Sequence, residues 1–279
     1  MANLPQDFQF TIASDIFNPG EPILIDSATQ TRWGADQIIG TGGDYGIIVF
    51  ETTLRTGLGR DTVNGSGVGN GILVFNATID TGWNSDTISG FNSTNGIFNF
   101  NGNIQTGLGN DLISGVGSDS GVVNFGVINT GFGRDTITGS GSLFGILNDG
   151  TINTGPGNDT ITGIGGVAGI LLSGGEINTG LGNDVVDALN GGFLGSGLVN
   201  LGWGNDTLKG FGSGQFHGGA GFDQLQFNPG SYSILSSGDG FIIGSIMAIS
   251  GFEAIGSNLA SIREGIVSIG SDGAATFAI

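Results

Sequence analysis

The chain has 279 residues, of which 59 are glycine, and its 24 acidic and 6 basic residues give a formal net charge of −18. Glycine is about three times as frequent as in average proteins. The absence of a Gly-X-Y period excludes a collagen triple helix, and a hydrophobic content of 38% argues against simple disorder. Such an acidic chain disfavours nucleic acid as a partner. No apolar run is long enough to span a membrane, and we expect one elongated domain.

The first 30 residues carry no repeat, and they contain one short apolar run, residues 23–25, that is typical of a strand. Residues 1–20 lack the basic start and the apolar core of a cleaved signal peptide. We expect residues 1–30 to form an N-terminal cap, because the open strand edge of a repetitive β-structure favours aggregation unless it is covered.

Between residues 31 and 227 a short loop of the form Thr-Gly-x-Gly-x-Asp returns again and again, most clearly at residues 106–111, 154–159 and 179–184. Successive loop aspartates are 25, 25, 25, 24, 24, 25, 22 and 17 positions apart. A period of this size indicates a solenoid in which each repeat forms one coil. The aspartates are Asp36, Asp61, Asp86, Asp111, Asp135, Asp159, Asp184, Asp206 and Asp223, called the Asp column below.

Each loop is followed by three apolar segments. The first is a polar–apolar–polar triplet, such as residues 160–162, whose alternation predicts a strand with one buried face. The second lies at residues 46–50 and 71–75 and at equivalent places, and the third is a single aliphatic position such as Ile104. We therefore expect three short strands per coil, which bury their apolar faces by stacking on the next coil. In the second segment, Asn99, Asn124 and Asn148 are compatible with either an internal amide ladder or a row facing solvent.

The repeat stops near residue 228, and residues 232–234, 241–249 and 266–269 are expected to be strands of a C-terminal cap. This cap comprises residues 228–279. Its last residues, 271–279, are acidic and then small and apolar, which is compatible with a C-terminal secretion signal.

The loop and its triplet resemble the repeats-in-toxin (RTX) nonapeptide G-G-x-G-x-D-x-U-x, a calcium-binding β-helix repeat. The resemblance covers residues 31–227 and implies an all-β fold, a right-handed parallel β-solenoid (β-helix or β-roll) between the two caps. It also implies that Ca²⁺ lies between adjacent loops, with all nine members of the Asp column as ligands. The family's usual route to the cell surface or the extracellular medium is type I secretion.

The loops depart from this family in ways that change the expected metal sites. One nonapeptide is followed here by a long insert, so the enlarged 24–25-residue coils should carry metal along one edge only. Carboxylates and carbonyls on glycine-bent loops suit Ca²⁺, and a chain with no Cys and a single His is poorly suited to transition metals. Arg32 and Asn84 replace loop glycines. Asn tolerates a left-handed conformation and Arg does so badly, so we expect the Asp36 site to be degraded.

Stacked carboxylates about 5 Å apart would repel each other by roughly 3 kcal/mol per pair at an effective dielectric of 20. We therefore expect the β-structure to require calcium, and we expect the protein to be a calcium-binding extracellular structural or interaction module. An enzyme with a site on a solenoid face or in the C-terminal region is the alternative, although His217 is expected to be a turn residue. A second alternative is an ice-binding or adhesion protein, suggested by a row of loop threonines: Thr31, Thr56, Thr81, Thr106, Thr130, Thr154 and Thr179.

The third loop position is apolar in eight loops, and we call this row the apolar stripe: Trp33, Leu58, Trp83, Leu108, Phe132, Pro156, Leu181 and Trp203. An exposed stripe would favour a partner, because contiguous exposed apolar patches mark interfaces. We expect two copies to form a homodimer through it about a two-fold axis. The competing interpretation is that a terminal cap covers the stripe.

Overall fold

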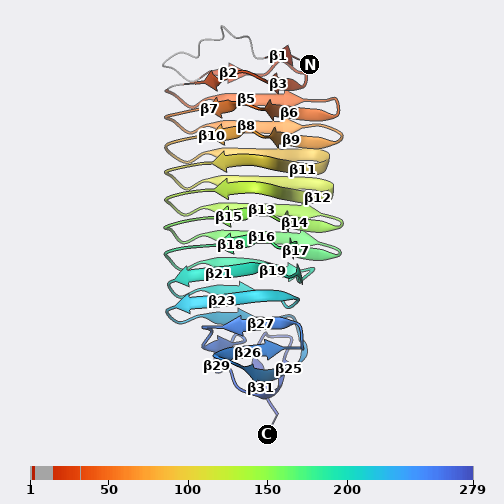
Figure 1. Cartoon of the computed structure of the whole chain (residues 1–279), viewed down its shortest axis with the longest axis vertical. Coiled ribbons are helices and arrows are strands. Elements are labelled where there is room, and N and C mark those ends of the chain that lie inside the picture. The colour runs from red at the N-terminus through yellow and green to blue at the C-terminus, as the bar shows by residue number, and fades with distance from the viewer. Residues whose placement is uncertain (1, 4–14, 32, 279) are drawn as a thin grey trace.

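The chain folds into a stack of coils with its two ends at opposite ends of a rod, as the computed structural model shows for residues 2–3, 15–31 and 33–278 (Figure 1). All regular elements of these residues are strands, and from the first coil to the last they pair in parallel with their counterparts one coil away. The expected all-β parallel β-solenoid is confirmed. Within the described part of the chain, no helix has the length and hydropathy needed to cross a membrane.

Three strands form each regular coil, and they correspond to the three apolar segments of the repeat. Two coils consist of a single strand that bends through all three segments, β11 (Thr87–Gln105) and β12 (Leu112–Asn129). The coils before them contain β5 (Gln37–Thr41), β6 (Tyr45–Phe50) and β7 (Thr53–Arg55), then β8 (Thr62–Ser66), β9 (Asn70–Phe75) and β10 (Thr78–Asp80). The coils after them contain β13 (Thr136–Gly141), β14 (Phe144–Asn148), β15 (Thr151–Asn153), β16 (Thr160–Gly165), β17 (Ala168–Leu172), β18 (Glu176–Asn178), β19 (Val185–Asn190), β20 (Phe193–Gly195), β21 (Leu198–Trp203), β22 (Thr207–Lys209), β23 (Gly214–Ala220) and β24 (Gln224–Gln226).

The core is a set of aliphatic columns that run through the stack. Ile88, Ile113 and Ile137 are direct partners in successive first strands, and each is fully buried. The second and third strands contribute equivalent columns to the same cluster. One of these columns is interrupted by amides, since the Nδ2 of Asn99 donates to the Oδ1 of Asn124, and that of Asn124 donates to the Oδ1 of Asn148, both at 2.8 Å. These asparagines therefore form an internal amide ladder.

The difference between 24- and 25-residue coils arises at the corner between the second and third strands. Three 25-residue coils carry one extra residue there with a positive φ, namely Glu51 (51°), Asn76 (47°) and Asn101 (51°). The pairing of β11 with β12 has a register shift between Phe100 and Asn103, which places the extra residue at this corner. The strands on both sides keep their alignment, so the loop on the opposite edge stays in register whichever coil length is used.

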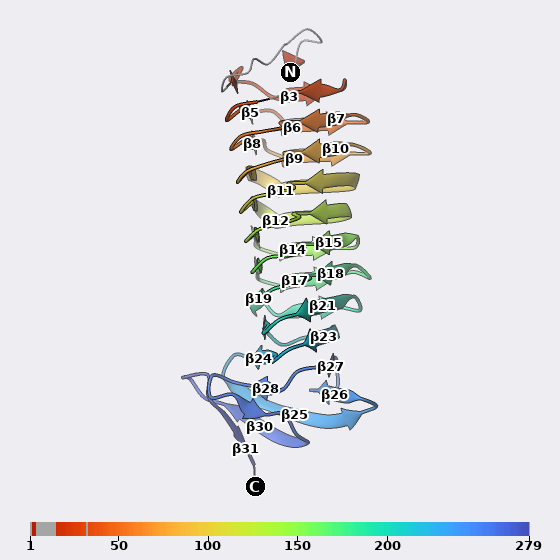
Figure 2. The ribbon, with the colours of Figure 1, turned by 90° about the vertical axis from the view of Figure 1, so that its left-hand side faces the viewer.

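The segments expected as caps also contribute to the stack. At the first end, β1 (Ala2–Asn3), β2 (Ile16–Phe17), β3 (Ile23–Ile25) and β4 (Thr29–Gln30) pair in parallel with β3, β5, β6 and β7, respectively. At the other end, antiparallel strands spread beyond the width of the coils (Figure 2). They are β25 (Gly230–Ser237), β26 (Gly240–Ile243), β27 (Met247–Ser250), β28 (Ala254–Ile255), β29 (Ala260–Ser261), β30 (Gly265–Ile269) and β31 (Ala275–Phe277). Of these, β27 and β28 also pair in parallel with β23 and β24, so the last coil passes through this region.

Candidate functional site

The Thr-Gly-x-Gly-x-Asp loops stack directly on one another along one edge of the solenoid. The amide of Leu108 donates to the carbonyl of Gly82 in the preceding loop, and the amide of Gly109 donates to the carbonyl of Phe132 in the following loop. The regular loops require glycine at the fourth position, because a Cβ at Gly133, for example, would lie 1.4 Å from the carbonyl oxygen of Gly109. Where Asn84 replaces this glycine, its φ of 78° confirms the expected left-handed conformation. Arg32, which replaces glycine at the second position of the first loop, lies outside the described residues.

The Asp column is buried at the base of these loops, and every member makes the same contact. In each case the Oδ1 atom accepts a hydrogen bond from the backbone amide of the aspartate one coil earlier, as from Asp86 to Asp111 and from Asp111 to Asp135, at 2.8 Å. All nine aspartates are at most 2% exposed. The structure thus brings together all the aspartates that the sequence singled out, as a continuous ladder of carboxylates and amides.

The second oxygen of each carboxylate is different. The Oδ2 atoms of all nine aspartates are buried without a hydrogen-bond partner. Burial raises the pKa of these carboxyls, to about 6 for Asp111 and Asp159, about 7 for Asp206 and about 8 for Asp86, and the neighbouring amides oppose this only in part. A buried ionised carboxylate with an unsatisfied oxygen is costly, because neither water nor a donor replaces its lost hydration. The column therefore has capacity for a further positive charge or proton at every coil.

The loop threonines lie beside the carboxylates, inside the edge. Those from Thr31 to Thr179 are fully buried, and the hydroxyl of Thr106, for example, donates to the carbonyl of Thr130 at 3.0 Å. They are a hydrogen-bonding row within the edge, so this row is not an array of surface hydroxyls that could order ice. Outward-facing threonine pairs exist elsewhere, on the first strands, at Thr136 with Thr138 and at Thr160 with Thr162.

The donor set of the column fits a hard cation that takes oxygen ligands. Among the described residues, no three His, Cys, Asp or Glu side chains converge as a ready-made metal site. A cation between two loops would therefore rely on the orphaned Oδ2 atoms together with main-chain carbonyl oxygens. The fourth-position carbonyls point along the stack towards the next loop, as that of Gly109 does towards Gly133. Ca²⁺ accepts such mixed, flexible oxygen shells, whereas Mg²⁺ demands near-ideal octahedral geometry.

Two residues that the sequence analysis did not assign extend the column at its ends. At the first end, the amide of Asp15 donates to the Oδ1 of Asp36 at 2.8 Å, so the backbone of Asp15 stands one coil before the first loop. At the other end, the Oε2 of Glu253 accepts a hydrogen bond from the amide of Asp223 at 2.7 Å. The signal for Glu253 was present in the sequence, since Gly-Phe-Glu-Ala-Ile at residues 251–255 parallels Gly-Phe-Asp-Gln-Leu at residues 221–225. The altered spacing and the change from Asp to Glu obscured it.

The apolar stripe is a straight exposed row on the outside of the same loops. Isolated parallel bridges connect its residues from Trp33 to Phe132 and from Pro156 to Trp203. The side chains of Trp33, Trp83, Phe132 and Trp203 are 58%, 60%, 60% and 70% exposed. Within the described residues no cap covers these side chains, so the interpretation of a covered stripe does not hold for that part of the chain. The third, fourth and fifth positions of these eight loops contain no acidic residue, while Arg60 and Arg134 are exposed beside the stripe.

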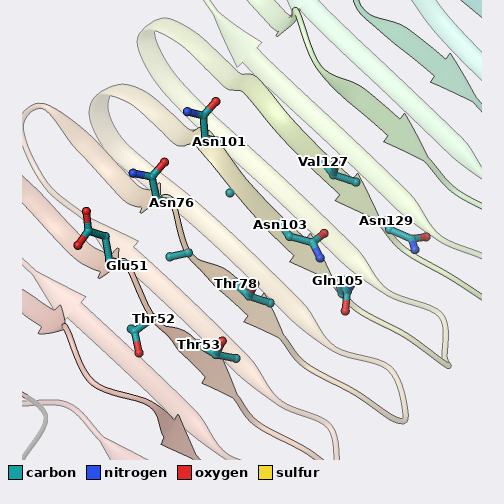
Figure 3. A pocket seen from close by; sticks show the side chains of 12 residues that line it. Glu51, Thr52, Thr53, Asn76, Thr78, Asn101, Asn103, Gln105, Val127 and Asn129 are labelled. Carbon is teal, nitrogen blue, oxygen red and sulfur yellow. The ribbon is translucent and has the colours of Figure 1, made fainter.

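A shallow groove lies on another face, where the left-handed corner meets the third strands (Figure 3). One side carries the corner residues Glu51, Asn76 and Asn101, and the other side carries Thr78 and Asn103 among others (Figure 3). This lining is polar and offers one carboxylate with no nucleophile–base pair. It gives no support to the enzyme alternative.

His217 was expected to be a turn residue, and this expectation is wrong. His217 is an exposed residue within strand β23, and its Nδ1 forms a hydrogen bond with the Oγ of Ser250 in β27. The parallel pairing of β23 with β27 places these two residues directly opposite each other. The contact therefore joins the last coil to its neighbour at the surface.

No protein-family model matches the chain, and a search of curated proteins finds no match either. A search of solved structures finds the crystal structure of a hyperactive, Ca²⁺-dependent, β-helical antifreeze protein from an Antarctic bacterium. The two chains are 20% identical with a TM-score of 0.49, over 78% of this chain and 68% of the other. A likeness at this level carries no conclusion about what this chain binds.

Proposed function

We propose that the protein is a calcium-stabilised β-solenoid that acts as an interaction module rather than as an enzyme. The observation that carries this proposal is the Asp column, in which nine buried carboxylates each leave one oxygen without a donor. Cations between successive loops would satisfy these oxygens and remove the repulsion between stacked charges, which is roughly 3 kcal/mol per neighbouring pair. The binding energy would then contribute directly to folding, as it does in other proteins whose metal sites exist only in the folded state.

Calcium titration of the metal-free protein tests this proposal. We expect far-UV circular dichroism to gain β-signal, and the melting temperature to rise, as Ca²⁺ is added to protein treated with a chelator. The same concentration of Mg²⁺ should have a much smaller effect, because the loops offer flexible carbonyls in place of octahedral geometry. An identical β-signal and melting temperature with calcium and with chelator would show that the column is not a calcium site.

The same proposal places the protein outside the cell, at the cell surface or in the medium after type I secretion. Each coil supplies only one carboxylate, and sites with few charged ligands bind calcium at the weak end of the range, about 10⁻⁴ to 10⁻³ M, which is typical of extracellular modules. Isothermal titration calorimetry should therefore give affinities in this range. Affinities in the nanomolar range would instead indicate an intracellular buffer.

The apolar stripe is the surface that we propose for interaction, with a second copy of the chain as its occupant. Three indoles and a phenyl ring face solvent in one line, and aromatic residues are favoured anchors at interfaces. The chain as a whole is strongly acidic, but the third to fifth positions of these loops carry no carboxylate, and the nearby Asp80 is paired with Arg55 at 3.2 Å. A straight row also suits an isologous pairing, in which the same patch of both copies meets about a two-fold axis.

Sedimentation velocity of the calcium-loaded protein tests the homodimer. We expect a dimer for the wild type and a monomer for the double variant Trp83→Ser/Trp203→Ser. The matched control is Val68→Ser, which removes an equally exposed apolar side chain (72%) at another corner of the coil. A wild-type monomer whose indoles are quenched freely by acrylamide would refute the pairing.

A further inference from the structure

The C-terminal region contains a tenth position of the Asp column, and Glu253 occupies it. Strand β24 pairs in parallel with β28 so that Gln224 stands opposite Ala254 and Leu225 stands opposite Ile255. The residue opposite Asp223 is therefore Glu253. The two segments also agree in sequence around this point, with Gly-Phe before each acidic residue.

The backbone and side-chain contacts of Glu253 repeat those of a column aspartate. The amide of Asp206 donates to the Oδ1 of Asp223 at 2.8 Å, and the amide of Asp223 donates to the Oε2 of Glu253 at 2.7 Å. Likewise, the amide of Gln224 donates to the carbonyl of Asp206 at 2.9 Å, and that of Ala254 donates to the carbonyl of Asp223 at 3.2 Å. The ladder thus continues from the regular loops into the cap without interruption.

Glu253 replaces the aspartate of the earlier coils at the end of a loop that is shorter than the others. Ser250 stands opposite His217 in the pairing of β23 with β27. Six steps along the chain lead from His217 to Asp223, but only three lead from Ser250 to Glu253. The shorter loop approaches Glu253 by a different path, and the additional methylene of Glu253 extends its carboxylate to the amide of Asp223, 2.7 Å from the Oε2 atom.

The space between these two carboxylates is also unlike the earlier sites. Asp223 is fully buried and its Oδ2 has no hydrogen-bond partner. The first position of its loop is Gly218, where a Cβ would lie 2.7 Å from that Oδ2, so no threonine hydroxyl accompanies it. The carboxylate of Glu253, which is an exposed residue, adjoins Asp223 through the Asp223 amide, so a buried unsatisfied oxygen and a solvent-facing carboxylate belong to neighbouring positions at this junction.

We propose that Asp223 and Glu253 together hold a terminal calcium ion, which fastens the C-terminal region, residues 228–279, to the solenoid. This inference rests on the proposed calcium function and adds a site that the repeat pattern does not include. The chain between the two ligands contains the hairpin of β25 and β26 and the strand β27. A cation shared by Asp223 and Glu253 would close this excursion and hold the cap over the last coil.

Three glutamate variants test the site with calcium alone as the probe. Glu253→Gln keeps an oxygen that accepts the Asp223 amide but removes the charge, so it should fold and bind one calcium ion fewer per chain. Glu253→Asp keeps the charge but loses the reach, and it should lose the same ion. Glu264→Gln is the control, because Glu264 lies in the same cap and accepts a hydrogen bond from the amide of Ser236, outside the column. It should bind calcium like the wild type.

Hydrogen exchange of the cap provides the second readout. In saturating calcium, amides of β25 to β31 should exchange faster in Glu253→Gln than in the wild type, whereas the mid-column variant Asp111→Asn should lose calcium without this effect on the cap. If Asp111→Asn lowers the calcium stoichiometry while Glu253→Gln binds and protects like the wild type, the terminal site is refuted and the calcium column stands. If the wild type binds no calcium, the proposed function fails and the terminal site fails with it.

Discussion

Replacing one column aspartate by asparagine should stabilise the metal-free protein and weaken the calcium-loaded one. Asp111 is 2% exposed, its Oδ1 accepts the amide of Asp86 at 2.8 Å, and its Oδ2 has no partner. Asparagine has the same shape and keeps the accepting oxygen. The hydroxyl of Thr106 interacts with this carboxylate and donates its own proton to the carbonyl of Thr130, so it is free to accept a hydrogen bond from the new amide group. The substitution therefore removes the buried charge without removing the ladder.

The magnitude follows from the pKa of the carboxyl. Burial raises the pKa of Asp111 from 3.8 to about 6, so the ionised form is less favourable in the fold than in the unfolded chain. At about 1.4 kcal/mol per pH unit this difference is about 3 kcal/mol at neutral pH. Because the new amide group of asparagine must itself find a hydrogen-bond partner, we expect Asp111→Asn to stabilise the metal-free protein by about 1–3 kcal/mol. For a chain of this size the melting temperature should rise by about 2–5 °C.

Urea unfolding followed by circular dichroism, once in chelator and once in saturating calcium, measures both signs. The control is Asp149→Asn, since Asp149 is an exposed residue at a corner of the following coil, between β14 and β15. It should change the unfolding midpoint little in either condition. In calcium, Asp111→Asn should unfold at lower urea than the wild type, because it loses a ligand. If Asp111→Asn destabilises the metal-free protein, its buried charge is not the cost that we infer, and the argument fails.

Three further predictions concern the column, the amide ladder and the loop glycines. First, burial gives the column carboxyls of Asp86, Asp111, Asp159 and Asp206 pKa values of about 6 to 8, so they bind protons more tightly in the fold than in the unfolded chain. The metal-free fold should therefore lose stability as the pH rises from about 4 to 8. A melting temperature in chelator that stays constant or rises across this pH window would contradict the prediction. Second, Asn124→Val should destabilise the fold by about 1–3 kcal/mol, because the buried Oδ1 of Asn148 then loses its hydrogen-bond donor. Changing Asn99, Asn124 and Asn148 to Val together should cost less than three times as much. If urea unfolding shows losses of stability that simply add, the three amides of the ladder are not coupled. Third, Gly133→Ala should destabilise the fold by more than about 2 kcal/mol, since the φ of Gly133 is 142° and the Cβ would lie 1.4 Å from the Gly109 carbonyl oxygen. The control is Gly42→Ala, because Gly42 also has a positive φ but has open space around the position of a Cβ. Equal melting temperatures of the two variants would refute the close contact at Gly133.

The sequence predicted those features that depend on period and alternation. The spacing of the aspartates identified the coil and the column, and the triplets identified the first strands, because a buried face shared by every coil imposes the same residues at the same intervals. The direction of Asn99, Asn124 and Asn148 could not be predicted in this way. An asparagine side chain on a strand can face either the core or the solvent, and only the stacking of three amides at hydrogen-bonding distance makes the core-facing orientation favourable.

Other features depend on the path of the chain between repeats. Glu253 follows Asp223 after thirty residues that include a hairpin, so no period links it to the column, and only the parallel pairing of β24 with β28 does. His217 precedes a run of glycines that is typical of a turn, yet the pairing with β21 and β27 holds it in a strand. In both cases a neighbouring coil, rather than the local sequence, determines the conformation.

The left-handed corner at Glu51, Asn76 and Asn101 has a consequence for how this chain can change over time. Coils with and without the extra residue stack on each other in register, so a one-codon insertion or deletion at this corner alters neither the core columns nor the loops on the opposite edge. An indel within a strand would instead turn every following side chain to the other face. Length variation among descendants of this gene should therefore accumulate at this corner, next to the polar groove, while the carboxylate edge keeps its spacing.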